Sequence, residues 1–244
     1  MNSVPAIQSH FIVVVPAAGV GSRMGADRPK QYLTLAGKTL LDRTLHALLV
    51  HPRIDKLLVA IDSDDKYWAQ SEFCHDRRVS VVEGGSERCY SVLNALRSLE
   101  GKIEQQDWVM VHDVVRPLIQ LTDLDSLING LAGCEDGLVL GMPVHDTMKR
   151  TDVSGRVVAT VNRDLLWHAF TPQIFRLGQL RSALERCLSE RVRVTDESSA
   201  MEYCGFNPVM LQGSVTNIKI TRPDDLQLAE RFIKSVQGPK DVTD

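Results

Sequence analysis

Five short apolar runs, rich in valine, isoleucine and leucine, recur along the first 142 residues of the chain. They lack the alternation of apolar and polar residues that marks a half-buried strand, and such runs are typical of strands buried on both faces, as in a parallel sheet. The runs are FIVVV (11–15), KLLVAI (56–61), VSVV (79–82), WVMV (108–111) and GLVLGM (137–142).

Helical patterns lie between and after these runs. Leucines recur at helical spacing within 40–49, 92–99 and 121–131, and a further helix is expected at about 177–189. Short strands are expected at 209–212 and 218–220, and the T-x-x-D string at 221–224 starts a last helix. The alternation predicts an open, mainly parallel, Rossmann-like α/β sheet flanked by helices, with ligands beyond the carboxyl ends of its strands.

One segment, at about 143–163, breaks this rhythm. It holds two short β-like pieces around the turn signal DVSG, and we interpret it as a β-hairpin arm inserted in the α/β domain. The arm has too few apolar residues for a core of its own, so we expect it to rest on another part of the protein or on another subunit.

Composition sets limits on the class of protein. With 244 residues, 43% apolar and 24% charged, the chain suits a single domain, 1–244, that carries the arm. A net charge of −3 argues against nucleic acid as a partner. Five scattered cysteines without a C-x-x-C pair favour a reducing cytoplasm over a disulfide framework. No signal peptide and no membrane span is expected.

The first apolar run leads into a glycine-rich loop, PAAGVGSRMGADRPK (16–30). Its spacing, G-x-G-x-x-x-G, is neither the dinucleotide fingerprint nor a Walker A loop. Four small residues would let backbone N–H groups approach a phosphate closely: Ala17, Ala18, Gly19 and Gly21. Arg23 and Lys30 add two cations, which suit the larger charge of a nucleoside triphosphate and of a leaving pyrophosphate.

Two further clusters follow predicted strands. In VMVHDVVRP (109–117), Asp113 is a candidate Mg²⁺ ligand and Arg116 suits an anionic substrate; a turn cap and a surface arginine are the alternatives. In EGGSERCYSV (83–92), glycines open the backbone to a flat base, and Arg88 and Ser91 stand on the entering helix. Taken alone, this second cluster is equally a strand turn with a helix cap.

Taken in order, the motifs resemble the 2-C-methyl-D-erythritol 4-phosphate cytidylyltransferase family over about 11–235. The strings that carry the resemblance are PAAGVGSRMGADRPKQYLTLAGKTLL, GGSERCYSV, VHDVVRP, DTMKR, TPQIF, TDESSAMEYCG and NIKITRPDDL. The resemblance implies a nucleotidyltransferase domain that joins CTP to 2-C-methyl-D-erythritol 4-phosphate and releases pyrophosphate, in non-mevalonate isoprenoid biosynthesis. It also implies a homodimer joined through the arm.

The resemblance implies a role for each matching residue. The loop backbone at Ala17, Ala18, Gly19 and Gly21 would hold the CTP phosphates. Arg23, Lys30 and Lys219 would be catalytic cations at the α-phosphate and the leaving pyrophosphate. Gly85 and Ser91 would read the cytosine while Arg88 supports that loop, and Asp113 would hold Mg²⁺. The sugar-alcohol phosphate would be bound by Arg116 and, from the partner subunit's arm, by Thr147 and Arg163.

The sequence departs from the family pattern in places, and other functions remain open. Val114 and Val115 stand where alanines are common, Asn162 stands at a usual aspartate, and Ser86 stands where an acidic residue is frequent. The alternatives are a cytidylyltransferase for another polyol phosphate such as ribitol 5-phosphate, a non-catalytic nucleotide-binding protein and, more remotely, an NAD(P)-dependent oxidoreductase. No general base is expected, because the attacking group is itself a phosphate oxyanion.

Overall fold

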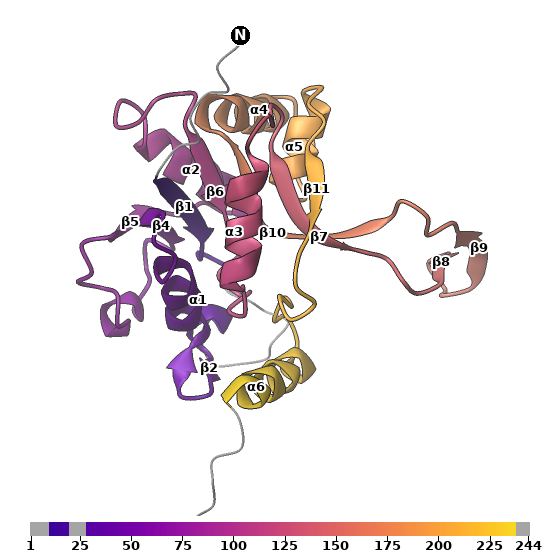
Figure 1. Ribbon diagram of the computed structural model, residues 1–244, viewed down its shortest axis with the longest axis horizontal. Coiled ribbons are helices and arrows are strands. Elements are labelled where there is room, and N and C mark those ends of the chain that lie inside the picture. Colours follow the sequence, from indigo (N-terminus) through magenta and orange to yellow (C-terminus); the bar gives the residue numbers. More distant parts are fainter. Residues whose placement is uncertain (1–9, 20–27, 238–244) are drawn as a thin grey trace, which may run out of the picture.

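A seven-stranded sheet forms the centre of the protein, which was analysed as a computed structural model that describes residues 10–19 and 28–237 (Figure 1). Its strand order is β11-β7-β10-β6-β1-β4-β5, and every neighbouring pair is parallel except those that involve β10. The predicted open, mainly parallel α/β sheet is therefore confirmed. The strands are β1 (Phe11–Pro16), β4 (Ile54–Ile61), β5 (Val79–Glu83), β6 (Trp108–Val111), β7 (Leu138–Pro143), β10 (Trp167–Arg176) and β11 (Val209–Gln212).

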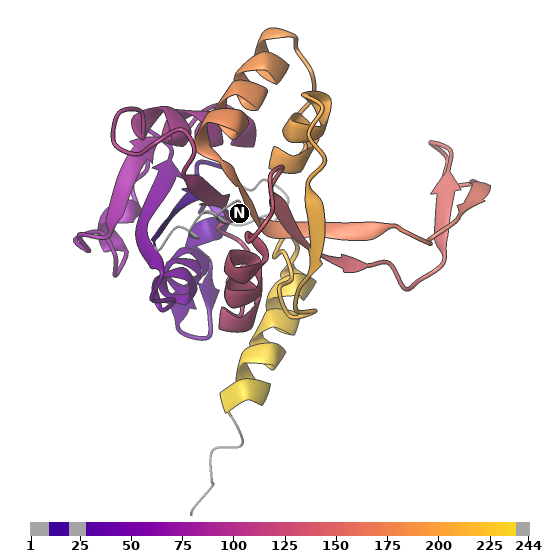
Figure 2. The ribbon, with the colours of Figure 1, turned by 45° about the horizontal axis from the view of Figure 1, so that its top comes forward.

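Helices cover both faces of this sheet (Figure 2). One core cluster joins the sheet to α1 (Leu40–Leu49), α3 (Leu121–Gly130) and α6 (Pro223–Gln237). The other joins it to α2 (Arg88–Ser98), α4 (Leu177–Ser189) and α5 (Glu197–Tyr203). Successive residues of β1 alternate between the clusters, with Val13 and Val15 in the first and Val14 in the second. This explains why the sequence shows uninterrupted apolar runs rather than alternation.

The late part of the chain differs from the sequence prediction in two respects. The predicted strand at 218–220 is wrong, because that segment forms no ladder. Its backbone bonds run from the Ile218 N–H to the Thr216 carbonyl at 2.7 Å and from the Ile220 N–H to the Val115 carbonyl at 2.9 Å. Strand β10, which runs antiparallel between β6 and β7, was not predicted from the sequence. Its ladder with β7 is interrupted between Ala169 and Gln173, around Pro172, which has no N–H to donate.

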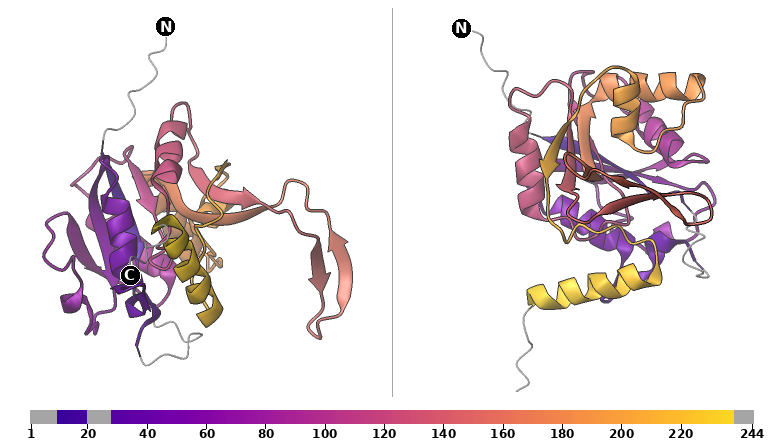
Figure 3. Two further views of the ribbon diagram at one scale, coloured as in Figure 1. Left: turned by 60° about the horizontal axis from the view of Figure 1, so that its bottom comes forward. Right: turned by 90° about the vertical axis from the view of Figure 1, so that its right-hand side faces the viewer.

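The arm projects away from the sheet, as Figures 1 and 3 show. Its strands, β8 (Met148–Thr151) and β9 (Val157–Val161), form a separate two-stranded antiparallel sheet around the predicted turn. Three valines on it are exposed: Val153, Val157 and Val158. A hairpin of this kind buries little apolar surface within its own subunit, so its stability must come in part from elsewhere.

Smaller elements complete the fold. A two-residue hairpin joins β2 (Thr34–Leu35) to β3 (Lys38–Thr39), and its turn places Ala36 and Gly37 at positive φ. Within 10–19 and 28–237, two 3₁₀ helices, η2 and η3, span Lys30–Tyr32 and Trp68–Gln70. Across the described residues, every helix is too short or too polar to span a bilayer.

Candidate active site

A pocket lies at the carboxyl edge of the parallel strands. Because β1, β4, β5 and β6 run in the same direction, their carboxyl ends meet along one edge of the sheet. A cavity of about 340 Å³ opens there, and each of these strands supplies a lining residue at its end or just beyond it: Pro16, Asp62, Gly85 and Asp113. Lys30 and Lys219 enter the same cavity from elsewhere in the chain. The pocket thus combines backbone turns with cations and a carboxylate.

The turn between β5 and α2 packs directly on the glycine-rich loop. A Cβ at Gly84 would lie 2.4 Å from the Cβ of Ala18, so this contact requires glycine. The N–H of Gly85 donates to the Ser91 hydroxyl at 3.0 Å, and Ser91 is only 2% exposed. Ser91 therefore fixes the turn that forms one wall of the pocket.

A buried glutamine holds the segment that follows the glycine-rich loop. Lys30 begins η2 and lines the pocket, and the next residue, Gln31, donates from Nε2 to the carbonyl of Ala17 at 2.6 Å. This bond joins the end of β1 to the segment that carries Lys30. Gln31 is 2% exposed, so the position of Lys30 relative to the strand end is set by a contact inside the protein.

Asp113 forms ion pairs with three cations of the site. Its Oδ1 accepts from Arg88 Nε at 2.9 Å, and its Oδ2 accepts from Lys219 Nζ at 2.8 Å. Arg116 Nε lies 3.7 Å from Oδ2, which is an ion-pair distance rather than a hydrogen bond. Burial alone would raise the pKa of this carboxyl, but the charges of Arg88, Lys219 and Arg116 outweigh it and hold the pKa far below its usual range. Asp113 is therefore a carboxylate at neutral pH.

The backbone around Asp113 is locked by two polar neighbours. The Asp113 N–H donates to Thr171 Oγ1 at 3.0 Å, and that hydroxyl lies 3.1 Å from His112 Nδ1. Burial lowers the pKa of His112 to about 4, so the ring is neutral. His112 Nε2 is 3.1 Å from the carbonyl of Arg116, which assigns the ring proton to Nε2 and lets Nδ1 accept from Thr171. His112 therefore holds the backbone of the loop after β6 in place.

A second, smaller cavity of about 180 Å³ adjoins the first, and Arg88, Asp113 and Lys219 line both. Its other walls come from β10 and the segment before α5. Arg116 also lines it: the guanidinium lies 4.8 Å from the centre of the Phe170 ring and donates to the Asn217 carbonyl at 2.7 Å. Two ligands that met at Asp113 would occupy these adjoining cavities.

Most of the residues singled out in the sequence come together here. The first cavity is lined by Ala17, Ala18, Gly19, Lys30, Gly85, Arg88, Ser91, Asp113 and Lys219, and the second by Arg116. Gly21 and Arg23 lie outside the described residues. Thr147 and Arg163 lie on the arm, and neither lines a cavity at the sheet edge. Arg163 donates to the His145 carbonyl at the base of the arm.

Three residues with clear roles in the geometry were not singled out: Gln31, Thr171 and Glu197. Each stands inside a string that carried the family resemblance, namely PKQYL, TPQIF and TDESSA. A buried glutamine, threonine or glutamate is not recognisable by spacing alone, since its importance lies in a partner distant in sequence. For Glu197 that partner is Arg88, 109 positions away.

The fold and this edge define the class of protein. A cavity that presents loop backbone, two lysines and a buried carboxylate beyond the strands of an α/β sheet is suited to binding and transferring phosphate groups, as in a nucleotidyltransferase. The sequence model of the 2-C-methyl-D-erythritol 4-phosphate cytidylyltransferase (IspD) family matches residues 11–235. The chain belongs to that family.

Individual relatives agree with this assignment. The curated 2-C-methyl-D-erythritol 4-phosphate cytidylyltransferase of Pseudomonas syringae pv. syringae is 50% identical over 218 residues, which cover 89% of this chain and 92% of the relative. The protein of that name from Vibrio atlanticus is 50% identical over 224 residues, or 91% and 94% of the two chains. The crystal structure of the Francisella tularensis protein has a TM-score of 0.80 at 38% identity and covers 91% of this chain and 99% of that one.

Proposed function

We propose that the chain transfers the cytidylyl group of CTP to 2-C-methyl-D-erythritol 4-phosphate and releases pyrophosphate, in non-mevalonate isoprenoid biosynthesis. The observation that carries the proposal is the pair of adjoining cavities that share Asp113, Arg88 and Lys219. CTP would occupy the larger cavity and the acceptor the smaller one. Family membership and the names of relatives at 50% identity support the identity of both substrates.

The reaction needs charge stabilisation and alignment. An oxygen of the acceptor phosphate bonds to the α-phosphorus of CTP as the bond from that phosphorus to the bridging oxygen of pyrophosphate breaks. Because the attacking oxygen is already anionic, no side chain has to remove a proton. Lys30 and Lys219, which line the cavity, would stabilise the charge that moves onto the α-phosphate and the leaving group, together with Arg23 of the loop.

Asp113 suits a Mg²⁺ ion that is held mainly by its substrate. The described residues contain no group of three or more His, Cys, Asp or Glu that could enclose a metal, so one carboxylate would be joined by phosphate oxygens and water. Lys219 now occupies Oδ2 of Asp113, and its side chain is 40% exposed, which leaves it free to turn toward the α-phosphate. Bound Mg²⁺ would supply neutralising charge on the phosphates.

We further infer a cytoplasmic homodimer of one nucleotidyltransferase domain, 1–244, joined through the arm at about 143–163. The exposed valines of the arm support the subunit contact. The position of Thr147 and Arg163, away from the cavities of their own subunit, supports a role in the partner's acceptor site. All five cysteines are free thiols, which supports a reducing compartment.

A panel of substrates tests the reaction itself. Pyrophosphate release is expected only when CTP, Mg²⁺ and 2-C-methyl-D-erythritol 4-phosphate are present together, with little release for ATP, GTP or UTP. Ribitol 5-phosphate in place of the acceptor is the decisive comparison, since a faster reaction with it would assign a different polyol phosphate. Tight NADH binding without CTP binding would contradict the whole assignment.

Mixed dimers test the exchange of arms between subunits. Lys30→Ala and Arg163→Ala are each expected to abolish most activity, but a dimer with one of each, isolated with two affinity tags, retains one intact site. Its turnover is expected to be about half that of the wild type. The matched control pairs a wild-type subunit with a subunit that carries both substitutions. That dimer is inactive if arms are exchanged and half-active if they are not, so the two dimers give opposite results.

A further inference from the structure

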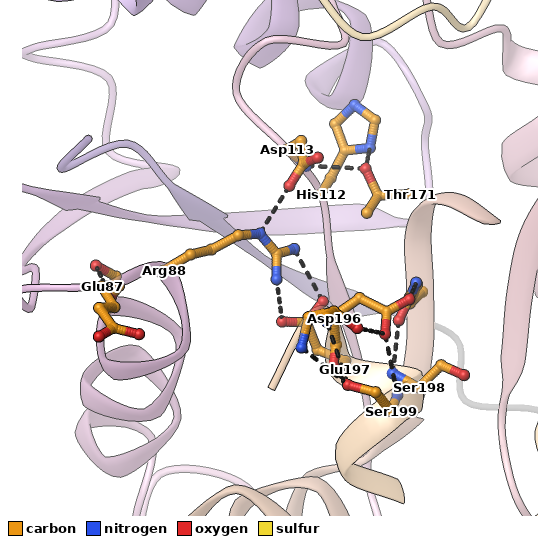
Figure 4. A network of polar contacts seen from close by, with 12 residues as sticks. Glu87, Arg88, His112, Asp113, Thr171, Asp196, Glu197, Ser198 and Ser199 are labelled. Atoms are coloured by element: carbon orange, nitrogen blue, oxygen red, sulfur yellow. Dashed lines mark hydrogen bonds and ion pairs between the residues drawn. The ribbon is translucent and has the colours of Figure 1, made fainter. Parts of the chain in front are cut away.

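Glu197 is a fully buried carboxylate that lines neither cavity, and yet it contacts a residue that lines both. It is the first residue of α5 and is 0% exposed. Its two oxygens accept from the two terminal nitrogens of Arg88, at 2.7 Å and 2.9 Å. Figure 4 shows the guanidinium of Arg88 between Glu197 on one side and Asp113 on the other. The question is what this buried ion pair does.

Contacts other than this ion pair also attach α5 to the sheet. Asp196 and Ser199 form a capping box at the start of this helix. Gln173 on β10 accepts from the Ser198 N–H at 2.8 Å and donates to Asp196 at 2.8 Å. Ala200 and Met201 are buried in the core cluster on that face of the sheet. With these contacts present, a buried ion pair adds little to stability, because desolvation opposes most of its Coulomb attraction.

The geometry of Arg88 suggests another role. Glu197 takes both terminal nitrogens in a two-pronged contact, so only Nε of Arg88 is directed at Asp113, where it binds Oδ1. The other oxygen of Asp113 is thereby left to Lys219. Without Glu197, the whole guanidinium could turn to Asp113 and compete with Lys219 for Oδ2.

The charge balance points the same way. Three cations, Arg88, Arg116 and Lys219, face two carboxylates, Asp113 and Glu197. If Glu197 were neutral, the same three cations would face Asp113 alone. Each of the three cations would then interact more strongly with the Asp113 carboxylate, which would be less available to a further cation such as Mg²⁺.

We infer that Glu197 is a positioning residue, which holds Arg88 so that Asp113 keeps one oxygen available to Lys219 and to the charges that accompany the nucleotide. This inference rests on the proposed function, since it assigns Asp113 to the phosphate end of CTP. It also gives α5 a part in the reaction. The two residues before Glu197, Thr195 and Asp196, line the smaller cavity. The guanidinium of Arg88 therefore connects α5, next to the proposed acceptor site, with Asp113 in the proposed nucleotide site.

The test compares isosteric variants of two glutamates on the same helix. Glu197→Gln is expected to lower kcat about 10- to 100-fold and to weaken binding of Mg²⁺–CTP about tenfold or more, as for other residues that orient a metal-binding carboxylate. Glu197→Asp keeps the charge and is expected to recover part of both losses. The control is Glu202→Gln: Glu202 is exposed, accepts from Ser198 and lines neither cavity, and this variant is expected to match the wild type.

Calorimetric titration with Mg²⁺–CTP separates this inference from the proposed function, because it needs no turnover. A wild-type protein without pyrophosphate release would contradict the function, while the affinities of the variants would still measure the effect of Glu197. If Glu197→Gln had a lower Tm but wild-type kcat and affinity, the inference would be overturned. Should that variant not fold, Arg88→Met combined with Glu197→Leu removes both charges. Its kcat is compared with that of Arg88→Met alone: equal losses would mean that Glu197 acts through Arg88 and would support the inference, whereas a normal kcat or a further loss in the double variant would overturn it.

Discussion

Replacing Lys30 by alanine is expected to lower kcat by about 10²–10³-fold, the loss found when one preorganised charge-stabilising group is removed from an active site. Lys30 lines the cavity at the end of β1, on a segment that Gln31 ties to the strand. A cation held in this way stabilises the transition state more than the bound substrate, because charge moves onto the leaving pyrophosphate during the reaction. The loss is therefore expected mainly in kcat rather than in the KM for CTP, measured by pyrophosphate release.

A second lysine provides the control for this prediction. Lys38 lies eight positions further on, in β3, and pairs with Glu72 at 2.7 Å on the surface. Exposed ion pairs of this kind contribute about 0–1 kcal/mol, so Lys38→Ala is expected to retain both activity and Tm. Wild-type kcat in Lys30→Ala would contradict the role proposed for Lys30. A large change in KM with kcat preserved would assign it to substrate binding alone.

The parts of the fold that could be predicted from the sequence are those set by local pattern. Strands buried on both faces must be apolar throughout, and this made β1, β4, β6 and β7 recognisable. The apolar run of β5 also predicted a strand, but β5 lies at the edge of the sheet and none of its residues is buried, so the prediction of burial on both faces is wrong there. Since parallel strands end at a common edge, the position of Asp113 after β6 was enough to place it beside the glycine-rich loop. The first cavity follows from these two facts.

The parts that could not be predicted depend on contacts between distant segments. In β10, the polar residues Thr171 and Gln173 and the interruption at Pro172 hide the strand, because their partners come from α5 and from the loop after β6. Lys219 was expected on a strand, but it lies on a segment without secondary structure, which forms no ladder. What places it in the cavity is its ion pair with Asp113, together with the bond from Ile220 to Val115. A short run of apolar residues occurs both in strands and in segments that form no ladder, so the sequence alone could not show which of the two 218–220 is.

Asp113→Asn is the substitution expected to disturb the site most. It keeps the size of the side chain but removes the negative charge with which Arg88, Arg116 and Lys219 all pair. Breaking a buried ion pair by neutralising one partner costs about 3–5 kcal/mol, so the Tm is expected to fall by roughly 10 °C. The substitution also removes the carboxylate proposed for Mg²⁺ and the anchor of Lys219, and kcat is expected to fall about 10³-fold.

The pH dependence of stability gives this prediction a second measurement. Because the folded-state pKa of Asp113 is lowered, the stability that it contributes is complete above the unfolded pKa of about 3.9 and is lost as the pH falls toward the folded value. The difference in unfolding free energy between wild type and Asp113→Asn is therefore expected to be largest at neutral pH and to shrink below about pH 4. Chemical denaturation in the absence of added metal measures it.

Asp123→Asn is the matched control, because Asp123 and Asp113 are both 6% exposed. Asp123 accepts from the Ser214 N–H at 2.9 Å and forms no ion pair with any residue that the structure describes, and burial raises its pKa. Its neutralisation removes no ion pair, so both activity and Tm are expected to stay close to those of the wild type. Equal losses of stability in the two variants would mean that burial of an amide, rather than the loss of charge, weakens the protein. An unchanged kcat in Asp113→Asn would remove Asp113 from the proposed mechanism and leave the two lysines to stabilise the phosphates alone.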